Sequence, residues 1–190
     1  GRGTWEFDGG AFMNQASHYV DMVQWLVGPV ESVSAKTGTL ARRIESEDTG
    51  IAILRFRNGA LGVIEVTMLT YPRNLEGSLT VIGERGTVKV GGTALNRIEH
   101  WEFAEYDDDD REVEALRAAP NPLSVYGSGH RAYYENVARV LSGEEAPGTD
   151  GREGRKSLDL ILGIYESART GREVTLPLRG FGARETHARE

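Results

Sequence analysis

The first strong pattern along the chain is a row of apolar positions at helical spacing. Residues 11–27 contain no glycine or proline, and apolar side chains recur among them every three or four positions. Gly28 and Pro29 follow directly, a pair that commonly ends a helix. The spacing and its ending predict a helix from Ala11 to Val27.

The middle of the chain alternates apolar and polar positions, as half-buried strands do. The alternation predicts strands at residues 30–41, 51–57 and 61–70. Asn58 and Gly59 separate the last two of these strands. This pair favours a type I′ turn, in which both central residues have positive φ, so we predict a tight hairpin.

The rest of the chain predicts a second hairpin followed by two further helices. Apolar side chains alternate in three short segments after residue 77 and return to helical spacing after residue 127. A glycine follows each helical segment, where it favours the end of a helix. The expected elements are strands at 78–82, 87–90 and 97–104, helices at 128–141 and 152–170, and a short strand at 173–176.

Strands joined by hairpins, with helices before and after them, indicate an α+β domain. We expect a largely antiparallel, open-faced β-sheet with helices packed on one face. One domain over residues 1–178 is expected to carry it, followed by a polar tail at 179–190. The predicted strand at 61–70 has apolar side chains on both faces, Val63 on one and Ile64 on the other. Since an apolar open face favours assembly, we expect a homodimer or homotetramer.

The composition narrows the classes of function. The 190 residues include 22 lysines and arginines against 29 aspartates and glutamates, a net charge of −7 that disfavours nucleic acid as a partner. The absence of cysteine excludes disulfides and thiolate metal sites. No apolar run is long enough to span a membrane, and the start does not resemble a signal peptide. We therefore expect a cytoplasmic protein with no membrane partner.

The candidate chemistry lies on the first predicted helix. Asn14, His18 and Asp21 are four and three positions apart, so a regular helix places them on one face. A histidine can accept a proton near neutral pH, an aspartate one turn away can orient it, and an amide can hydrogen-bond a hydroxyl group. This set fits a general acid–base site acting on an alcohol. The same spacing fits equally well a histidine held by an aspartate for structural reasons.

Two further segments carry side chains suited to binding a ligand. Tyr71, Arg73 and Asn74 follow a predicted strand, and an arginine in such a loop can bind a carboxylate or phosphate through two hydrogen bonds. Tyr126 and His130 flank a glycine-containing segment at the start of a predicted helix, where backbone N–H groups are free. Residues of these kinds are also common in loops, and for His130 a structural role is favoured over a role in binding.

The sequence contains no motif for binding a cofactor. It has no G-x-G-x-x-G, Walker loop, H-E-x-x-H or G-x-S-x-G segment. An acid–base histidine without a cofactor or a nucleophile makes an incomplete enzyme. The chain also begins without methionine and soon reaches Trp5, which together with Arg2 is a further candidate for binding. We expect a piece cut from a longer protein, the alternative being a processed natural N-terminus.

Several motifs occur in an order that is typical of one family. They are found at residues 9–21, 25–30, 47–49, 58–60, 83–87 and 173–177, so they cover nearly the whole chain. Together they resemble the C-terminal domain of the Gfo/Idh/MocA oxidoreductases, the superfamily of glucose–fructose oxidoreductase and inositol dehydrogenase. Three further segments, at residues 71–78, 126–130 and 150–157, are most similar to the branch that oxidises UDP-linked N-acetylhexosaminuronic acids at the sugar 3-hydroxyl.

The resemblance implies the substrate-binding half of an NAD(P)-dependent sugar oxidoreductase. In this family NAD or NADP is bound mainly by an N-terminal Rossmann domain, which this chain lacks, so the isolated chain is expected to be inactive. The family's acid–base histidine corresponds to His18, which Asp21 would orient. Asn14 stands where many members have an aspartate, so its implied role is to bind a substrate hydroxyl. The expected partner is a small-molecule sugar, and no metal ion is expected. The other residues expected to meet the substrate are Trp5, Tyr71, Arg73, Asn74, Tyr126 and His130.

A second hypothesis is a non-catalytic module for assembly or ligand binding that has kept the fold and lost the chemistry. The coding sequence upstream of Gly1 separates the two hypotheses. A strand followed by G-x-G-x-x-G in the same frame would favour the enzyme. A start codon immediately before Gly1 would favour the module.

Overall fold

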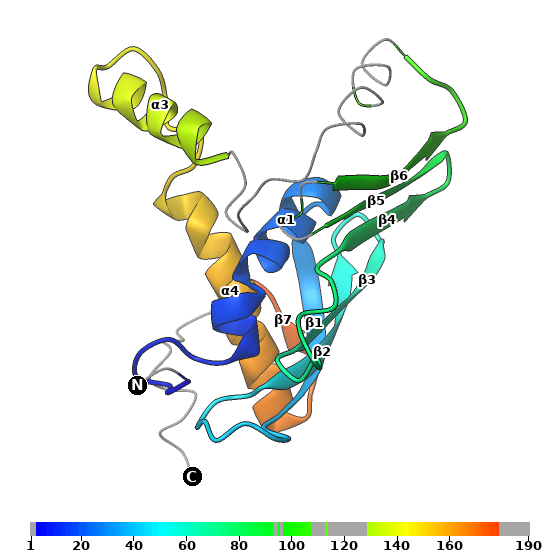
Figure 1. Cartoon of the computed structure of the whole chain (residues 1–190), viewed down its shortest axis with the longest axis vertical. Helices are drawn as coiled ribbons and strands as arrows, with labels where there is room; N and C mark the ends of the chain where they lie inside the picture. The colour runs from blue at the N-terminus through cyan, green and yellow to red at the C-terminus, as the bar shows by residue number, and fades with distance from the viewer. Residues whose placement is uncertain (1–2, 93–94, 96, 108–112, 114–128, 179–190) are drawn as a thin grey trace. The chain divides into compact units, whose positions relative to one another are not determined.

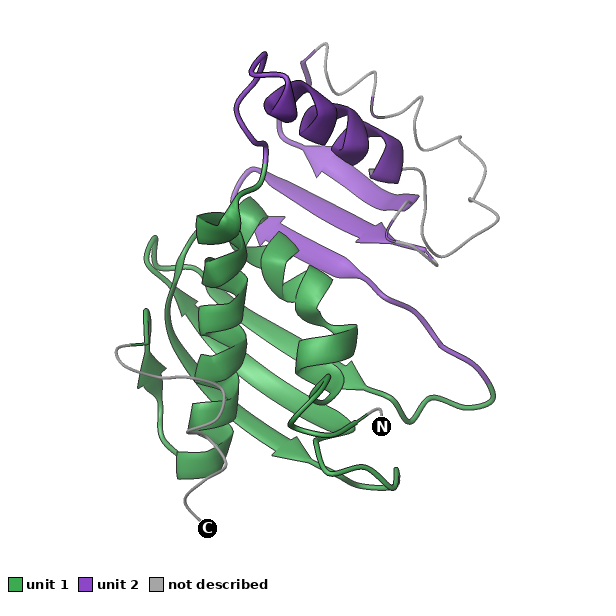
Figure 2. Cartoon of the chain, turned by 90° about the vertical axis from the view of Figure 1, so that its left-hand side faces the viewer, with its two compact units in different colours: residues 1–72, 149–190 green, residues 73–148 purple. Residues whose placement is uncertain are grey.

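The computed structural model describes residues 3–92, 95, 97–107, 113 and 129–178. It divides the chain into two compact units, residues 1–72 with 149–190 and residues 73–148 (Figure 2). Each unit is built on an antiparallel sheet with helical segments. The expected α+β class is therefore confirmed, with the strands arranged in two sheets instead of one continuous sheet.

The larger unit contains a four-stranded antiparallel sheet in the order β3–β2–β1–β7. β1 (Val30–Gly38) pairs with both β2 (Thr49–Phe56) and the short β7 (Val174–Thr175). β3 (Leu61–Thr67) pairs with β2 and lies at the other edge. These bounds agree with the predicted strands to within a few residues.

Two helices lie on one face of this sheet (Figure 1). α4 (Gly151–Thr170) packs along β1 and β7, and α1 (Ser17–Val27) packs on α4. Alternate side chains of β2 are buried beneath the helices. Burying one large apolar side chain stabilises a fold by about 1.5–3 kcal/mol, so this layer supplies much of the core. Its fully buried members include Phe12, Val20, Val33, Leu54, Phe56, Leu160 and Ile164.

α4 has a cap at each end, which explains why its bounds follow from the sequence. Asp150 Oδ1 accepts hydrogen bonds from the N–H groups of Arg152 at 2.8 Å and Glu153 at 3.1 Å. This is the usual bonding of an aspartate at a helix N-cap. Gly171 follows the helix with φ of 68°, a conformation that glycine adopts without steric cost.

The opposite face of the larger sheet carries apolar side chains that no described residue covers. Ile53 and Val63 are paired across β2 and β3, and they are 60% and 68% exposed. Ile51 and Leu61 lie two positions away on the same face, and both are exposed. On β3 these exposed positions alternate with the buried Ile64, which confirms the two-faced pattern predicted for this strand.

The smaller unit contains a three-stranded antiparallel sheet in the order β4–β5–β6. Its strands are β4 (Leu79–Gly83), β5 (Gly86–Gly91) and β6 (Arg97–Phe103), so the predicted second hairpin and the strand after it are confirmed. The unit also contains α3 (Gly129–Leu141), which matches the predicted helix. Within the described ranges, no helix is both long enough and apolar enough to cross a membrane.

The first predicted helix is divided in the structure. Residues Ala11–Gln15 form a π-helical turn, η1, and α1 begins at Ser17 after a break at Ala16. The prediction of one regular helix from Ala11 to Val27 is therefore wrong at its N-terminal end. The first N–H groups of η1 are bound by residues distant in the sequence, Glu47 and Tyr165.

The turn between β2 and β3 also differs from the prediction. Gly59 has φ of 90°, but Asn58 does not have positive φ, so the turn is not of type I′. The Asn58 side chain accepts a hydrogen bond from the N–H of Ala60 at 3.0 Å and donates one to the carbonyl of Val27 at 2.8 Å. These bonds hold Asn58 at the end of α1, a tertiary contact that the turn sequence alone does not reveal.

Candidate active site

The predicted acid–base residues lie on the surface where η1 meets α1. Asn14 is on η1, His18 is in the first turn of α1, and Asp21 is one turn further along. All three side chains are exposed. Gln15 Nε2 donates a 2.7 Å hydrogen bond to Asn14 Oδ1. An exposed imidazole in the first turn of a helix is open to a hydroxyl group that approaches from outside the chain.

The π turn changes how Asn14 and His18 are related. The N–H of Ala16 donates to the carbonyl of Ala11 at 2.9 Å, which spans five residues, whereas an α-helical bond spans four. Asn14 lies inside this wide turn and His18 lies just after it, so the two do not share one regular helical face. Single π turns of this kind occur frequently at functional sites.

Asp21 is bonded to α4. Its Oδ1 accepts a 2.5 Å hydrogen bond from the hydroxyl group of Ser157. Nearby, Gln24 Nε2 donates to the carbonyl of Lys156 at 3.1 Å. Among the described residues, no hydrogen bond or ion pair joins Asp21 to His18. Asp21 therefore fastens α1 to α4, and its expected role of orienting His18 stays a proposal.

A buried carboxyl group and a tyrosine hydroxyl lie against the start of η1. Glu47, from the segment before β2, is 3% exposed, and its Oε1 accepts hydrogen bonds from the N–H of Phe12 at 2.8 Å and the hydroxyl of Tyr165 at 3.0 Å. The same hydroxyl, on α4, accepts from the N–H of Met13 at 3.2 Å. The backbone carbonyl of Glu47 accepts from the N–H of Ala11 at 2.9 Å. Two residues distant in sequence thus bind the first three N–H groups of η1.

Burial is the main influence on the pKa values of Glu47 and Tyr165. It raises the pKa of the Glu47 carboxyl group, outweighing the hydrogen bonds from the Phe12 N–H and the Tyr165 hydroxyl, which lower the pKa. Burial and the adjacent Glu47 carboxylate likewise raise the pKa of Tyr165. Glu47 Oε2 is buried and has no hydrogen-bond partner among the described residues. It lies so close to Gly10 that a Cβ at that position would be 1.9 Å away.

Two further predicted residues, Trp5 and Tyr71, belong to the larger unit. The ring of Trp5 packs edge-on against Tyr165, with the ring centroids 5.1 Å apart. The backbone N–H of Trp5 donates to Glu45 Oε2 at 3.4 Å. Trp5 is therefore close to the tyrosine that holds η1, while Tyr71, in the loop after β3, is 95% exposed.

Three of the remaining predicted binding residues belong to the smaller unit. Arg73 and Asn74 are exposed at the start of the smaller unit, and His130 is exposed in the first turn of α3. Tyr126 lies outside the described residues. The structure thus places Trp5 and the predicted acid–base residues in one unit and these binding residues in the other.

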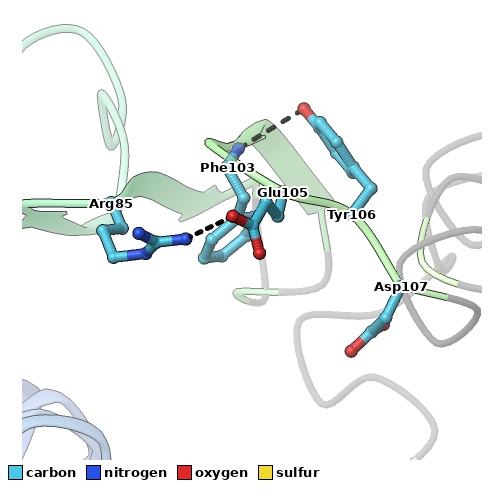
Figure 3. A pocket seen from close by; sticks show the side chains of 5 residues that line it. All are labelled: Arg85, Phe103, Glu105, Tyr106 and Asp107. Atoms are coloured by element: carbon cyan, nitrogen blue, oxygen red, sulfur yellow. Dashed lines mark hydrogen bonds and ion pairs between the residues drawn. The ribbon is translucent and has the colours of Figure 1, made fainter.

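A pocket lies near the end of β6 in the smaller unit (Figure 3). Two of the charged side chains that line it neutralise each other, because Arg85 forms a 2.9 Å ion pair with Glu105. The pocket includes none of the predicted site residues. In the described ranges, no group of three or more His, Asp or Glu side chains is arranged to hold a metal ion. The lining residues are Arg85, Phe103, Glu105, Tyr106 and Asp107.

Comparison with known proteins adds to this geometry. A family model described as the C-terminal alpha/beta domain of an oxidoreductase family, Gfo/Idh/MocA, matches residues 2–176. The chain belongs to this family. The match spans both compact units and confirms the resemblance that the order of motifs indicated.

Two solved structures of dehydrogenases are more than half identical to this chain. The WlbA dehydrogenase of Bordetella pertussis, in complex with NADH and UDP-GlcNAcA, is 62% identical with a TM-score of 0.87, over 94% of this chain and 51% of that chain. The WlbA dehydrogenase of Chromobacterium violaceum, with the same ligands, is 58% identical with a TM-score of 0.85, over 94% and 49%. A D-apiose dehydrogenase of Rhizobium rhizogenes is 24% identical over 165 residues, which are 84% of this chain and 46% of that protein. The chain spans about half the length of these relatives.

Proposed function

We propose that this chain is the substrate-binding half of an NAD(P)-dependent dehydrogenase that oxidises a UDP-linked N-acetylhexosaminuronic acid at the sugar 3-hydroxyl. The observation that carries the proposal is the 62% identity with a WlbA dehydrogenase crystallised with NADH and UDP-GlcNAcA. The similarity extends over 94% of the chain. The dinucleotide would be held mainly by residues outside this chain, since the sequence has no G-x-G-x-x-G motif.

The exposed imidazole of His18 supports a role as general base. Oxidation of an alcohol breaks a C–H and an O–H bond, and a nicotinamide cofactor supplies the acceptor for the hydride when it is bound. A nitrogen of the His18 imidazole would take the hydroxyl proton as the ketone forms. Asn14 has no basic group, so its amide would instead hydrogen-bond a hydroxyl group of the sugar. Both side chains are exposed, which suits a site completed by a second surface.

The anionic parts of such a substrate need cations and hydrogen-bond donors. Arg73 can bind a uronate carboxylate or a pyrophosphate through two parallel hydrogen bonds. Tyr71, Asn74, Tyr126 and His130 add aromatic surface and polar groups. We assign these residues and Trp5 to the substrate. Asp21 would position His18 through its helix, because the Ser157 bond holds α1 on α4.

The apolar open face of the larger sheet supports assembly of the protein through this surface. Ile51, Ile53, Leu61 and Val63 form a continuous exposed group on β2 and β3. Covering such a patch removes apolar surface from water, which is favourable, so large exposed patches often mark interaction sites. We therefore propose a homodimer or homotetramer in which the open face is buried.

The role of His18 is tested by its replacement with alanine in the full-length protein. NADH formation from NAD⁺ and UDP-GlcNAcA should fall about 10²–10⁴-fold in His18→Ala, the usual contribution of a general base. His100→Ala is a suitable control, because His100 lies on β6 beside Glu102 and outside the proposed site. A rate for His18→Ala close to that of the wild type would refute the assignment.

A further inference from the structure

We propose that Glu47 and Tyr165 are positioning residues that set the direction in which Asn14 and His18 point. The proposal rests on the function proposed for His18. Neither residue is exposed to a substrate, since Glu47 is 3% and Tyr165 is 6% exposed. Both act on the candidate site through the backbone of η1.

The start of η1 lacks the usual local cap. The first N–H groups of a helix have no partner inside the helix, and an adjacent side chain commonly binds them. At η1 the N-cap position is Gly10, which has no side chain to do so. Glu47 and Tyr165 bind these groups instead, at distances of 2.8 to 3.2 Å. The position where η1 starts is therefore determined by the loop before β2 and by α4.

Consecutive backbone hydrogen bonds connect the start of η1 to the turn that carries His18. The carbonyl of Ala11 accepts from the N–H of Ala16, and the carbonyl of Ala16 accepts from the N–H of Val20. His18 lies between these two positions in the first turn of α1. If the helix started one residue earlier or later, each side chain would rotate by about 100° about the axis, because a turn contains 3.6 residues. Asn14 and His18 would then face in different directions.

One oxygen of Glu47 has no hydrogen-bond partner in the part of the chain that the structure describes, which supports a role in geometry. A buried polar atom without a hydrogen bond destabilises a fold, and such atoms often mark functional positions. Glu47 Oε2 is such an atom among the described residues, and it lies close to the backbone of Gly10. Any side chain at residue 10 would collide with the carboxyl group, so glycine is required for this close approach. Together the two residues fix η1 in a single register.

Two substitutions in the full-length protein test the proposal. Tyr165→Phe keeps the ring that packs on Trp5 but removes the hydroxyl group bound to Glu47 and to the N–H of Met13. Glu47→Gln places an amide group against Gly10. We expect each variant to lose about 10- to 100-fold in kcat with UDP-GlcNAcA, as for a catalytic group misplaced by about 1 Å. The KM for NAD⁺ should stay within about twofold of the wild-type value.

Ser167→Ala is the matched control. Ser167 is also buried on α4, and its hydroxyl group accepts from the N–H of Ala35 at 2.9 Å and donates to the carbonyl of Arg172 at 2.6 Å. It touches β1 and not η1, so its loss should weaken the fold without changing kcat. A loss of kcat in Ser167→Ala equal to that in Tyr165→Phe would overturn the proposal, since general destabilisation would explain both.

Amide hydrogen exchange provides a readout that does not depend on activity. In the Tyr165→Phe protein, the peptide covering residues 10–16 should exchange about tenfold faster, because a lost cap lowers the free energy of opening. A tenfold change corresponds to about 1.4 kcal/mol. Unchanged exchange at this peptide would overturn the proposal. A wild-type protein that does not oxidise UDP-GlcNAcA would refute the proposed function. The exchange rates of the η1 peptide in the wild type and in Tyr165→Phe would still test whether Tyr165 holds η1.

Discussion

Asp48 holds the loop between β1 and β2, and its ionisation should make the stability of the protein depend on pH below neutrality. Its buried carboxylate accepts hydrogen bonds from the N–H groups of Leu40, Ala41 and Arg42 at 2.9, 2.9 and 2.8 Å. Burial alone would raise the pKa of Asp48. These three bonds and one from the Thr49 hydroxyl outweigh burial and lower the pKa from 3.8 to about 2.

The sign and size of the effect follow from this shift. Because the pKa is lower in the folded state than in the unfolded state, the ionised carboxylate stabilises the fold at pH values above 3.8. That stabilisation is lost as the pH falls from 3.8 through about 2. A difference of nearly two pKa units corresponds to about 2 kcal/mol.

Urea unfolding at a series of pH values, followed by circular dichroism, measures this contribution. Between pH 4 and 2 the wild type should lose about 2 kcal/mol more than Asp48→Asn, whose amide does not titrate. The titration of Glu47 changes stability in the opposite direction. Its pKa is raised from 4.5, so the stability it contributes is present below 4.5 and is lost as the pH rises. The same loss of stability on acidification in the wild type and in Asp48→Asn would refute the reasoning.

Two further predictions concern the larger unit. Asp150→Ala should lower the free energy of unfolding by about 1 kcal/mol, because two N–H groups at the start of α4 lose their acceptor; equal urea midpoints for the two proteins would contradict this. Val63→Glu should convert the assembled full-length protein to a smaller species in size-exclusion chromatography with light scattering, because a charge would be buried in the interface. Leu40→Glu, at an exposed apolar residue outside the strands, should leave the assembly unchanged, and a monomeric wild type would count against the interface.

Apolar spacing was sufficient to predict the elements whose ends are determined locally. Asp150 and Gly171 cap α4 from adjacent positions, so the sequence of the helix itself specifies where it begins and ends. The hairpin of β4 and β5 likewise has its glycines at the turn. Where tertiary contacts decide the geometry, the pattern was insufficient. Asn58 bonds to the carbonyl of Val27 at the end of α1 and lacks the positive φ that the turn sequence predicts.

The candidate site shows the same division between local and distant causes. The types and spacing of Asn14 and His18 marked them as candidates, and both side chains are exposed in the structure. Asn14 lies in the π turn, whose N–H groups at Phe12 and Met13 are bound by Glu47 and Tyr165, 35 and 152 residues away in the sequence. No window of the sequence around residue 14 contains that information. In the sequence, Glu47 and Asp48 are recognisable only as part of a family motif, which does not reveal the hydrogen bonds that they form.

Formation of NADH by the wild-type full-length protein is the decisive test of the proposed dehydrogenase activity. With NAD⁺ and UDP-GlcNAcA, we expect one NADH for each sugar oxidised. UDP-GlcNAc lacks the carboxylate that Arg73 is proposed to bind, so it should react at least about tenfold more slowly. Absence of NADH formation with UDP-GlcNAcA, in a folded protein that binds NADH, would contradict the account.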